Sequence, residues 1–361
     1  MSNRLLSSKR NRAISPALAL AGVTTHDCLL AGHFARAILE NPASVKYLVD
    51  AGISLLHEKA SGESIGGGGG VLVPQEIEPS IIALRDLNGI TRQFAHVIPM
   101  GSDERHWPRR AAGATAQFVT PENTAIVGSQ LSFDDIPLFA KKSAASIQIS
   151  NELYEDEIVG LGAWFILEVS AAFWRLEDDC TFIGDGSSAY GGIRGICNLL
   201  VDSNHTASKA AAAGTHSSLD KIDTTDLAAL MGLLPSFAWA NARWYCSGPG
   251  VGLCLARLAA VGGGTIGVAP DGLAYLGFPV SIVPSMPGAG SQVGKIVMAF
   301  GDLSLAVALG SRRGVTVGIS DHRYLEFDQT AMRGTERFDV VVANIGDSVN
   351  PGPIVGLTAT A

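Results

Sequence analysis

Apolar and polar positions between residues 146 and 196 follow three successive patterns, which predict an alternating strand, one long helix and a glycine-rich turn. In the helical part, apolar residues recur at spacings of three and four, which places one apolar stripe on a single face. The stripe consists of Ile158, Leu161, Phe165, Val169, Ala172 and Leu176. From Glu157 to Asp178 such a helix would be about 33 Å long at 1.5 Å rise per residue. The segment contains no nucleophile, base or metal-ligand cluster, which indicates a structural strut.

The pattern before this helix is mostly extended. Residues 33–60 have helical periodicity, broken near Pro42, and residues 66–70 form a glycine linker. Between Pro99 and Pro137, turn-forming residues separate short alternating pieces, which predicts a long two-stranded excursion. An unstructured loop of that length would be unusual in a compact domain, so we expect this segment to pack on another surface.

The pattern after the long helix mixes both types of element. Residues 201–221 are small and polar and predict a surface loop, and residues 224–234 predict a helix with Thr224 or Thr225 as N-cap. The segments ARWYCSG and FPVSIVPSM predict strands, VGLCLARLAAV predicts a helix, and residues 313–342 are rich in strand-forming residues. This part of the chain is therefore an α/β region followed by returning strands.

Several of these segments, in this order, resemble the major capsid proteins of tailed bacteriophages, the Hong Kong 97-like family. The segments that carry the resemblance are GGGGGVLVPQEIEPSII, AQFVTPENTAIVGSQLSFDDIPLFAKKSAASIQIS, ISNELYED, EDDCTFIGDG, GGIRGI, LGFPVSIVPSMP, AFGDLSLAVALGSRRGVTV and RGTERFDVVV. Together they span about residues 66–349. The resemblance implies an α+β Hong Kong 97-like capsid fold with a peripheral domain, an axial α/β domain, an extended β-hairpin loop and an N-terminal arm.

The resemblance also implies where these parts lie along the chain. The expected boundaries are an N-terminal arm or short scaffolding-like segment at 1–75, a peripheral domain at 76–98, 139–200 and 312–342 with a spine helix at about 152–179, an extended loop at 99–138, and an axial domain at 201–311 and 343–361. Family members often lose an N-terminal scaffolding segment by cleavage. Here that segment is short, and its retention as an arm stays open.

Composition favours burial against other chains. Only 17% of the residues are charged and 42 of 361 are glycine, against about 25% and 7% in ordinary soluble domains. A weakly charged enzyme would fit these numbers equally well. The net charge of −8 disfavours a protein that coats DNA, although it permits a shell around DNA. Five cysteines without a Cys-x-x-Cys pair fit a reducing compartment.

No run of 18 apolar residues occurs, so a membrane-spanning helix is not expected. Basic residues before the segment AISPALALAGV resemble the start of a signal peptide, but Pro16 interrupts the apolar run. A basic N-terminal arm is the favoured interpretation, with secretion as the alternative.

Segments that partly match catalytic or ligand-binding motifs lack the other residues that those motifs require. The glycines at 66–70 lack the Gly-Lys-Ser/Thr of a phosphate-binding loop, and Gly262, Gly264 and Gly267 lack the strand and acidic residue of a dinucleotide site. No histidine pair has metal-ligand spacing. Acidic residues gather at both ends of the predicted helix, where a solvated or interface face is the default interpretation: Glu152, Glu155, Asp156, Glu157, Glu177, Asp178 and Asp179. We therefore expect no catalytic, cofactor or metal site.

Some members of the resembled family join a lysine of the extended loop covalently to an asparagine of a neighbour. This chain has no lysine between Lys59 and Lys141, so non-covalent contacts are expected. Arginine–carboxylate pairs are the strongest ordinary option, and solvated surface charge is the alternative. The candidate intersubunit residues are Glu122, Phe118, Phe133, Arg312, Arg313, Arg333 and Arg337.

The resemblance implies a major capsid protein that self-assembles, as hexamers and pentamers, into an icosahedral shell enclosing double-stranded DNA without sequence specificity. Portal and scaffolding or decoration proteins are the other implied partners, with no membrane partner and no cofactor. The implied location is the virion, after assembly in the host cytoplasm. An encapsulin-like nanocompartment shell is the alternative within the same fold. A cytoplasmic α/β hydrolase-type enzyme is the alternative of another class.

Overall fold

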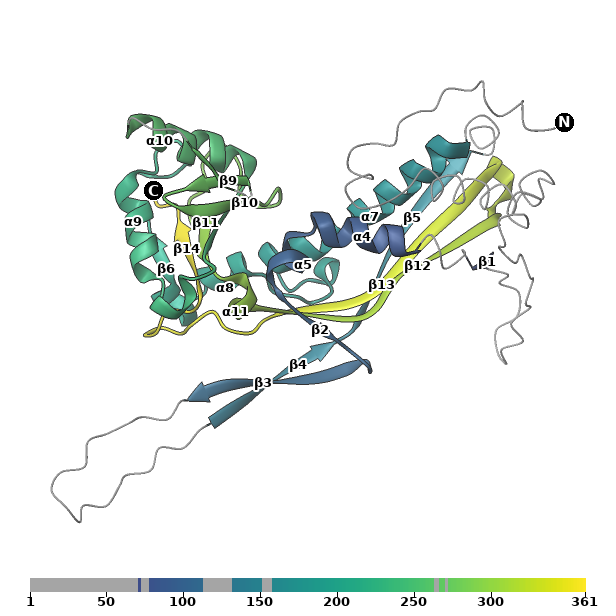
Figure 1. The fold of residues 1–361 in the computed structure, drawn as a ribbon, viewed down its shortest axis with the longest axis horizontal. Coiled ribbons are helices and arrows are strands. Elements are labelled where there is room, and N and C mark those ends of the chain that lie inside the picture. Colours follow the sequence, from purple (N-terminus) through teal and green to yellow (C-terminus); the bar gives the residue numbers. More distant parts are fainter. Residues whose placement is uncertain (1–70, 73–77, 113–131, 151–157, 263–265, 270–271) are drawn as a thin grey trace, which may run out of the picture. The chain divides into compact units, whose positions relative to one another are not determined.

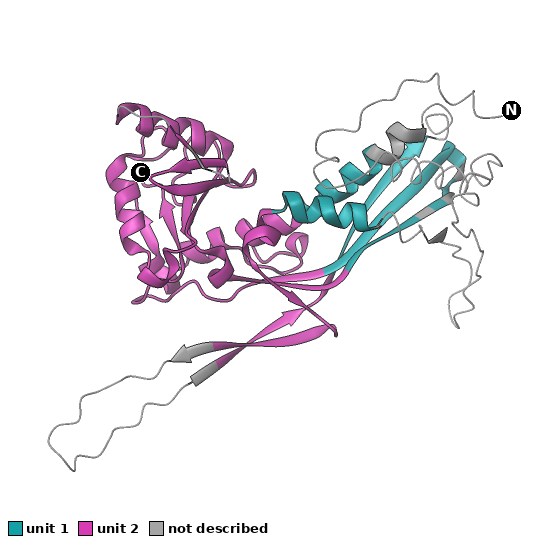
Figure 2. Cartoon of the chain, viewed as in Figure 1, with its two compact units in different colours: residues 1–89, 142–175, 314–337 teal, residues 90–141, 176–313, 338–361 magenta. Residues whose placement is uncertain are grey.

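The computed structural model describes residues 71–72, 78–112, 132–150, 158–262, 266–269 and 272–361 (Figure 1). The chain divides into two compact units, each assembled from separate stretches (Figure 2). Unit 1 comprises 1–89, 142–175 and 314–337, and unit 2 comprises 90–141, 176–313 and 338–361. The predicted helix at residues 33–60 and the glycine linker at 66–70 lie outside the described residues.

The described helices confirm a mixed architecture. They are α4 (Glu78–Asn88), α5 (Ile90–Phe94), α7 (Ile158–Phe182), α8 (Ile196–Val201), α9 (Thr224–Leu233), the π-helix η4 (Gly250–Ala256), α10 (Arg257–Val261) and α11 (Leu303–Ala306), with short 3₁₀ turns at η1 (Ser188–Tyr190), η2 (Ser203–Ser208), η3 (Ser236–Ala238) and η5 (Leu325–Phe327). Within this described part of the chain, no helix is both long enough and apolar enough to cross a membrane.

Five strands form one sheet, in the order β1-β12-β13-β5 with β2 also paired to β12. The strands are β1 (Val71–Leu72), β2 (His96–Pro99), β5 (Lys141–Ser150), β12 (Val307–Tyr324) and β13 (Gln329–Val342). The strands predicted for residues 313–342 are thus confirmed. In unit 1, α7 packs closely on this sheet, because a Cβ added at Gly334 would lie 2.9 Å from atoms of both Val169 and Phe173.

The long helix exists as predicted, but its apolar stripe differs in part. Phe165 and Val169 are buried, whereas Ala172 is exposed and Ile166 and Phe173 take the buried positions beside them. The helix ends at Phe182, and the predicted glycine turn follows it. The buried face of the helix is the one that meets the sheet. The three-and-four spacing in the sequence located this face only to within about one residue.

Unit 2 contains a seven-stranded sheet in the order β6-β14-β11-β7-β10-β9-β8. These strands are β6 (Lys209–Ala211), β7 (Arg243–Cys246), β8 (Gly267–Ala269), β9 (Gly272–Tyr275), β10 (Phe278–Ile282), β11 (Ile296–Gly301) and β14 (Ile354–Thr358). The core of this sheet is aromatic: the Trp244 and Phe300 rings lie 4.4 Å apart, and both side chains are fully buried. The predicted strands around β7 and β10 and the predicted helix at η4–α10 are confirmed.

Two local predictions in this unit were wrong. Residues 201–221 are not a plain surface loop, because they include η2 and β6 and bury Ser208, Ala210 and Leu219. The N-cap of α9 is Asp223 rather than either threonine, because its carboxylate accepts hydrogen bonds from the N–H groups of Thr225 and Asp226. A carboxylate at this position satisfies two otherwise unpaired helix donors.

The two-stranded excursion predicted between Pro99 and Pro137 is present as β3 (Glu104–Ala112) and β4 (Ser132–Phe139), which pair with each other in an antiparallel ribbon. The register runs from Glu104 opposite Phe139 to Ala112 opposite Ser132.

Candidate assembly surfaces

The foot of the β3–β4 ribbon is fastened to β13 by Asp339. This carboxylate is buried, and it accepts hydrogen bonds from the N–H group of Phe139 at 2.8 Å and from the Lys141 Nζ at 2.8 Å. Phe139 ends β4 and Lys141 begins β5, so one buried charge fixes the point where the ribbon leaves the sheet. A charge-assisted pair of this kind is stronger than a neutral hydrogen bond.

Arg109 also ties the ribbon to Ala343 after β13, and it pairs with Asp134 on the opposite strand of the ribbon. Arg109 donates from Nη1 to the carbonyl of Ala343 at 2.5 Å and from Nη2 to the carboxylate of Asp134 at 2.7 Å. Under the ribbon lies a small apolar cluster, made of Ile98, Met100, Leu138 and Ala308. The base of the ribbon therefore has a defined position on unit 2, although most of its residues beyond the base are exposed.

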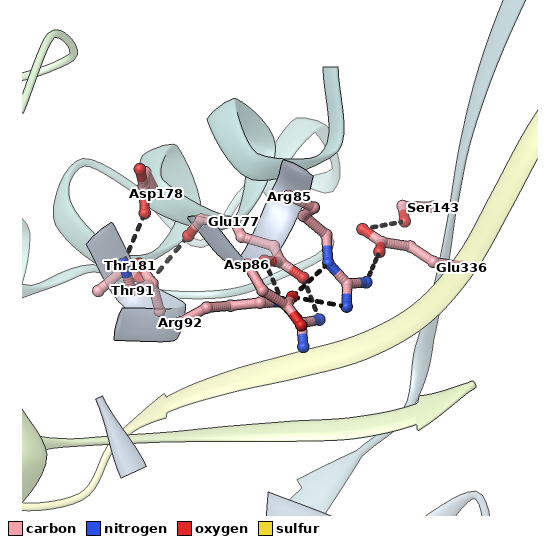
Figure 3. Close-up of polar contacts among 9 residues, drawn as sticks. All are labelled: Arg85, Asp86, Thr91, Arg92, Ser143, Glu177, Asp178, Thr181 and Glu336. Atoms are coloured by element: carbon pink, nitrogen blue, oxygen red, sulfur yellow. Dashed lines mark hydrogen bonds and ion pairs between the residues drawn. The ribbon is translucent and has the colours of Figure 1, made fainter. Parts of the chain in front are cut away.

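A second cluster of contacts joins α5 to the last turns of α7 within unit 2 (Figure 3). Arg92 donates to both carboxylate oxygens of Glu177, at 2.8 and 2.5 Å. Asp178 accepts hydrogen bonds from the N–H groups of Ile90 and Thr91, at 3.2 and 2.8 Å. Burial raises the pKa of Asp178 to about 6, while these N–H donors act in the opposite direction. The first turn of α5 is thus held by two adjacent carboxylates of α7.

These two carboxylates contradict the expectation of a solvated or interface face at the end of the helix. Glu177 is 0% exposed and Asp178 is 1% exposed. A buried carboxylate without a partner would be very costly, and here each one has partners that satisfy it. The acidic residues at the other end, Glu152 to Glu157, lie outside the described residues.

A third cluster lies within unit 1, where α4 meets β13 and β5 (Figure 3). Arg85 donates to Glu336 at 2.8 Å and to Asp86 at 2.9 Å. Glu336 also accepts from the hydroxyl of Ser143 at 3.3 Å. Both Arg85 and Glu336 are buried, so the pair fixes α4 on the sheet of this unit.

Five of the seven sequence-predicted contact residues lie in the described part of the chain. Arg312 contacts the carboxylate of Asp103, Arg313 is exposed, and both belong to unit 2. Arg333 is exposed and Arg337 is half-buried, and both belong to unit 1. Phe133 lies in β4 opposite Arg110 of β3.

The other two predicted contact residues, Phe118 and Glu122, lie outside the described residues. Their role, like that of the arginines, stays a prediction.

Residues His216, Asp223 and Asp226 place possible metal-ligand atoms within 4.8 Å of one another. The carboxylates already have partners, however. Asp223 caps α9, and Asp226 accepts hydrogen bonds from the Ala213 and Asp223 N–H groups and contacts His216 Nδ1 at 2.6 Å. This arrangement satisfies the start of a helix and the adjoining loop, so we assign it that structural role.

The fold just described is that of the shell proteins of phage capsids. It is similar to the capsid of an empty GTA particle computed with C5 symmetry, with a TM-score of 0.59 and 17% identity over 76% of this chain and 90% of that one. It is also similar to a chain of Mycobacterium phage Cain, with a TM-score of 0.53 and 21% identity over 74% and 88% of the two chains.

The sequence leads to the same family. The profile of the phage capsid family matches residues 69–345, and the chain therefore belongs to the phage capsid family. A major capsid protein of Klebsiella oxytoca phage phiKO2 is 34% identical over 122 residues. That match spans 34% of this chain and 28% of the phiKO2 protein. The Hong Kong 97-like resemblance is confirmed, and the encapsulin and hydrolase alternatives are not favoured.

Proposed function

We propose that this protein is the major head subunit of a tailed phage and assembles in many copies into a closed icosahedral shell around double-stranded DNA. The observation that carries this proposal is the capsid fold, which covers about three quarters of the chain and is supported independently by the family profile. Membership of this family points to a structural protein rather than an enzyme. Virion location and assembly in the host cytoplasm follow from the same proposal.

The β3–β4 ribbon supports a role in assembly. An isolated two-stranded ribbon is only marginally stable in water, yet this one is held by Asp339 at its foot and by Arg109 farther along. Such anchoring fixes the direction of the ribbon without covering its outer part. We infer that the outer part of segment 99–138 packs on a neighbouring subunit and that Phe118, Glu122 and Phe133 contribute to this contact.

The domain assignment is part of the same proposal. The peripheral domain would comprise 76–98, 139–200 and 312–342, and the axial domain 201–311 and 343–361, with 1–75 as an arm or a removable segment. The exposed arginines Arg313 and Arg333 are candidates for ionic contacts between peripheral domains.

The proposed shell is held without covalent links between loop and neighbour, because no lysine occurs between Lys59 and Lys141. The net charge of −8 suits a wall that encloses DNA without retaining it. Portal and scaffolding or decoration proteins are proposed as further partners, since a closed head needs an entrance and a controlled size.

Expression of the full chain, followed by sizing chromatography and negative-stain microscopy, tests the proposal. We expect closed particles far larger than an ordinary oligomer. Monomers to tetramers alone, across a range of salt and pH and in the presence of co-expressed neighbouring phage genes, would contradict it. Nuclease-protected DNA in the particles would distinguish a phage head from a shell that encloses protein.

A further inference from the structure

The turn between β9 and β10 contains a leucine in a backbone conformation that suits leucine poorly. Leu276 has φ 49° and Gly277 has φ 84°, so both central residues of this two-residue turn have positive φ. Turns of this kind strongly favour asparagine or aspartate followed by glycine. A side chain without a hydrogen-bonding group gains nothing there that offsets the strain.

The same leucine is also exposed. Its side chain is 59% accessible at the tip of the hairpin. A polar residue at this position would lower the backbone strain of the turn and would be better hydrated. Local strain combined with exposed apolar surface is a recognised sign of a functional contact. Of the three described non-glycine residues with positive φ, Thr215 and Asp328 carry polar side chains, and only Leu276 is apolar.

Trp239, which directly follows the η3 turn, packs on this hairpin, and Phe237 lies two residues before it in the chain. The Trp239 ring is 5.6 Å from the ring of Phe278, the first residue of β10 after the turn. Trp239 is 37% exposed and Phe237 is 61% exposed. We name Phe237, Trp239 and Leu276 the uncharged patch, because residues 227–242 and 272–294, from which they project, contain no Asp, Glu, Lys or Arg.

The absence of charge indicates what covers the patch. Copies of this chain carry a net charge of −8 and repel one another, so close approach needs surfaces that hold no charge to desolvate. Exposed Trp and Phe side chains are typical of the centre of a protein interface. A second copy of this chain offers both an uncharged surface and, in a capsid shell, a high local concentration.

We propose that the uncharged patch is a contact between subunits, in which Leu276 inserts into a second copy of this chain. The proposal rests on the proposed shell function. Three side chains cover less than the ~800 Å² per partner of a stable interface, so the patch is the anchor of a wider contact. The strained turn keeps the leucine projecting before assembly.

The test compares Leu276→Asn with Leu276→Met in the full chain. Asparagine relieves the turn, so the unassembled subunit should melt about 1–3 °C higher. It also removes the anchor, so the protein concentration at half-assembly should rise at least about tenfold. Methionine keeps an apolar side chain and should assemble within about threefold of the wild type. Val261→Asn is the matched control, because Val261 is 78% exposed and lies in α10 outside the patch; it should leave assembly unchanged.

Equal assembly of the asparagine variant and the wild type would overturn the inference, as would failure of the methionine variant or a lower melting temperature of the asparagine variant. A photoreactive phenylalanine analogue at position 237 identifies the occupant. Crosslinking should give a product of twice the subunit mass of 37.5 kDa; a product with any other protein instead would also overturn the inference. Failure of the wild-type protein to form shells would contradict the proposed function itself. That result is obtained before the variants are compared, so it is distinguishable from failure of the Leu276 proposal.

Discussion

Arg92 and Glu177 form a buried two-point ion pair between α5 and α7, with donor–acceptor distances of 2.8 and 2.5 Å. The Arg92 side chain is 7% exposed and that of Glu177 is 0% exposed. Both hydrogen bonds lie in a region that water scarcely reaches, so neither charge can be hydrated if its partner is lost. Loss of either partner therefore weakens the attachment of α5 to α7.

Replacing only Arg92 should lower the free energy of unfolding much more than replacing Arg92 and Glu177 together. Arg92→Leu leaves the Glu177 carboxylate buried without its counterion and should lower the free energy of unfolding by about 3–5 kcal/mol. The double variant Arg92→Leu/Glu177→Leu should recover much of this loss. Urea denaturation of the unassembled subunit measures both. A double variant no more stable than the single one would contradict this account.

Asp178 should give the subunit a specific pH dependence. Its pKa rises from 3.8 to about 6 on folding, because burial disfavours the charged carboxylate. A raised folded-state pKa means that its contribution to stability is fully present below about pH 4 and is lost as the pH rises through about 6. Relative to Asp178→Asn, the wild type should gain on the order of 3 kcal/mol of unfolding free energy between pH 7 and pH 4.

The measurement for Asp178 is chemical denaturation of both proteins across this pH range. The variant serves as the control, because contributions from all other titrating groups are common to both proteins and cancel. A difference between them that stays constant with pH would refute the assignment.

Gly334 should not tolerate a side chain. A Cβ at this position would lie 2.9 Å from atoms of Val169 and Phe173 on α7, so Gly334→Val should cost about 1–3 kcal/mol of stability through overpacking. Gly214→Ala is the control, since no atom lies within 4 Å of its added Cβ, and it should be neutral or slightly stabilising. Thermal melting of both variants tests this prediction. An unchanged melting temperature for Gly334→Val would contradict it.

Shortening the ribbon should separate folding from assembly. Ala112 of β3 faces Ser132 of β4, so residues 113–131 can be replaced by Asn-Gly to close a two-residue hairpin. The contacts of Asp339 and Arg109 remain, so the melting temperature should stay within about 2 °C, whereas shells should not form. Normal particles from this variant would remove the proposed intersubunit role of the segment.

Assembled protein should run as a monomer on a denaturing gel without reductant. The four described cysteines, Cys180, Cys197, Cys246 and Cys254, are free and buried. Burial raises the pKa of each thiol to about 12, which keeps it in the unreactive protonated form. A ladder of multimers resistant to boiling would point to a covalent link that the lysine-free loop does not predict.

Periodicity in the sequence predicted elements whose burial depends on near neighbours along the chain. The length of α7 and the pairing of β3 with β4 are examples. It failed for Glu177 and Asp178, because their partners lie in α5, 85 or more residues away. The same holds for Glu336, which pairs with Arg85 across 251 residues. A buried charge and a solvated one look alike in sequence until the partner is placed.

The cap of α9 illustrates a different limit. Asp223, Thr224 and Thr225 all have side chains that can cap a helix, but only Asp223 has an acidic residue three positions later, Asp226, as a capping box requires. The choice falls to Asp223 because Asp226 reaches back to its N–H group and to Ala213 at the same time. A local capping box, supported by the bond from Ala213, therefore sets where that helix begins, and the sequence pattern could have located it.

The place of β14 in its sheet bears on the order of events during synthesis. This strand lies between β6 and β11, and its residues, Ile354–Thr358, are translated after every other strand of the sheet. Until residue 358 has been made, β6 lacks its neighbour and the edge of β11 is open. The sheet is therefore incomplete until its last described strand has been made, and the edges left open at β6 and β11 can meanwhile pair with other chains.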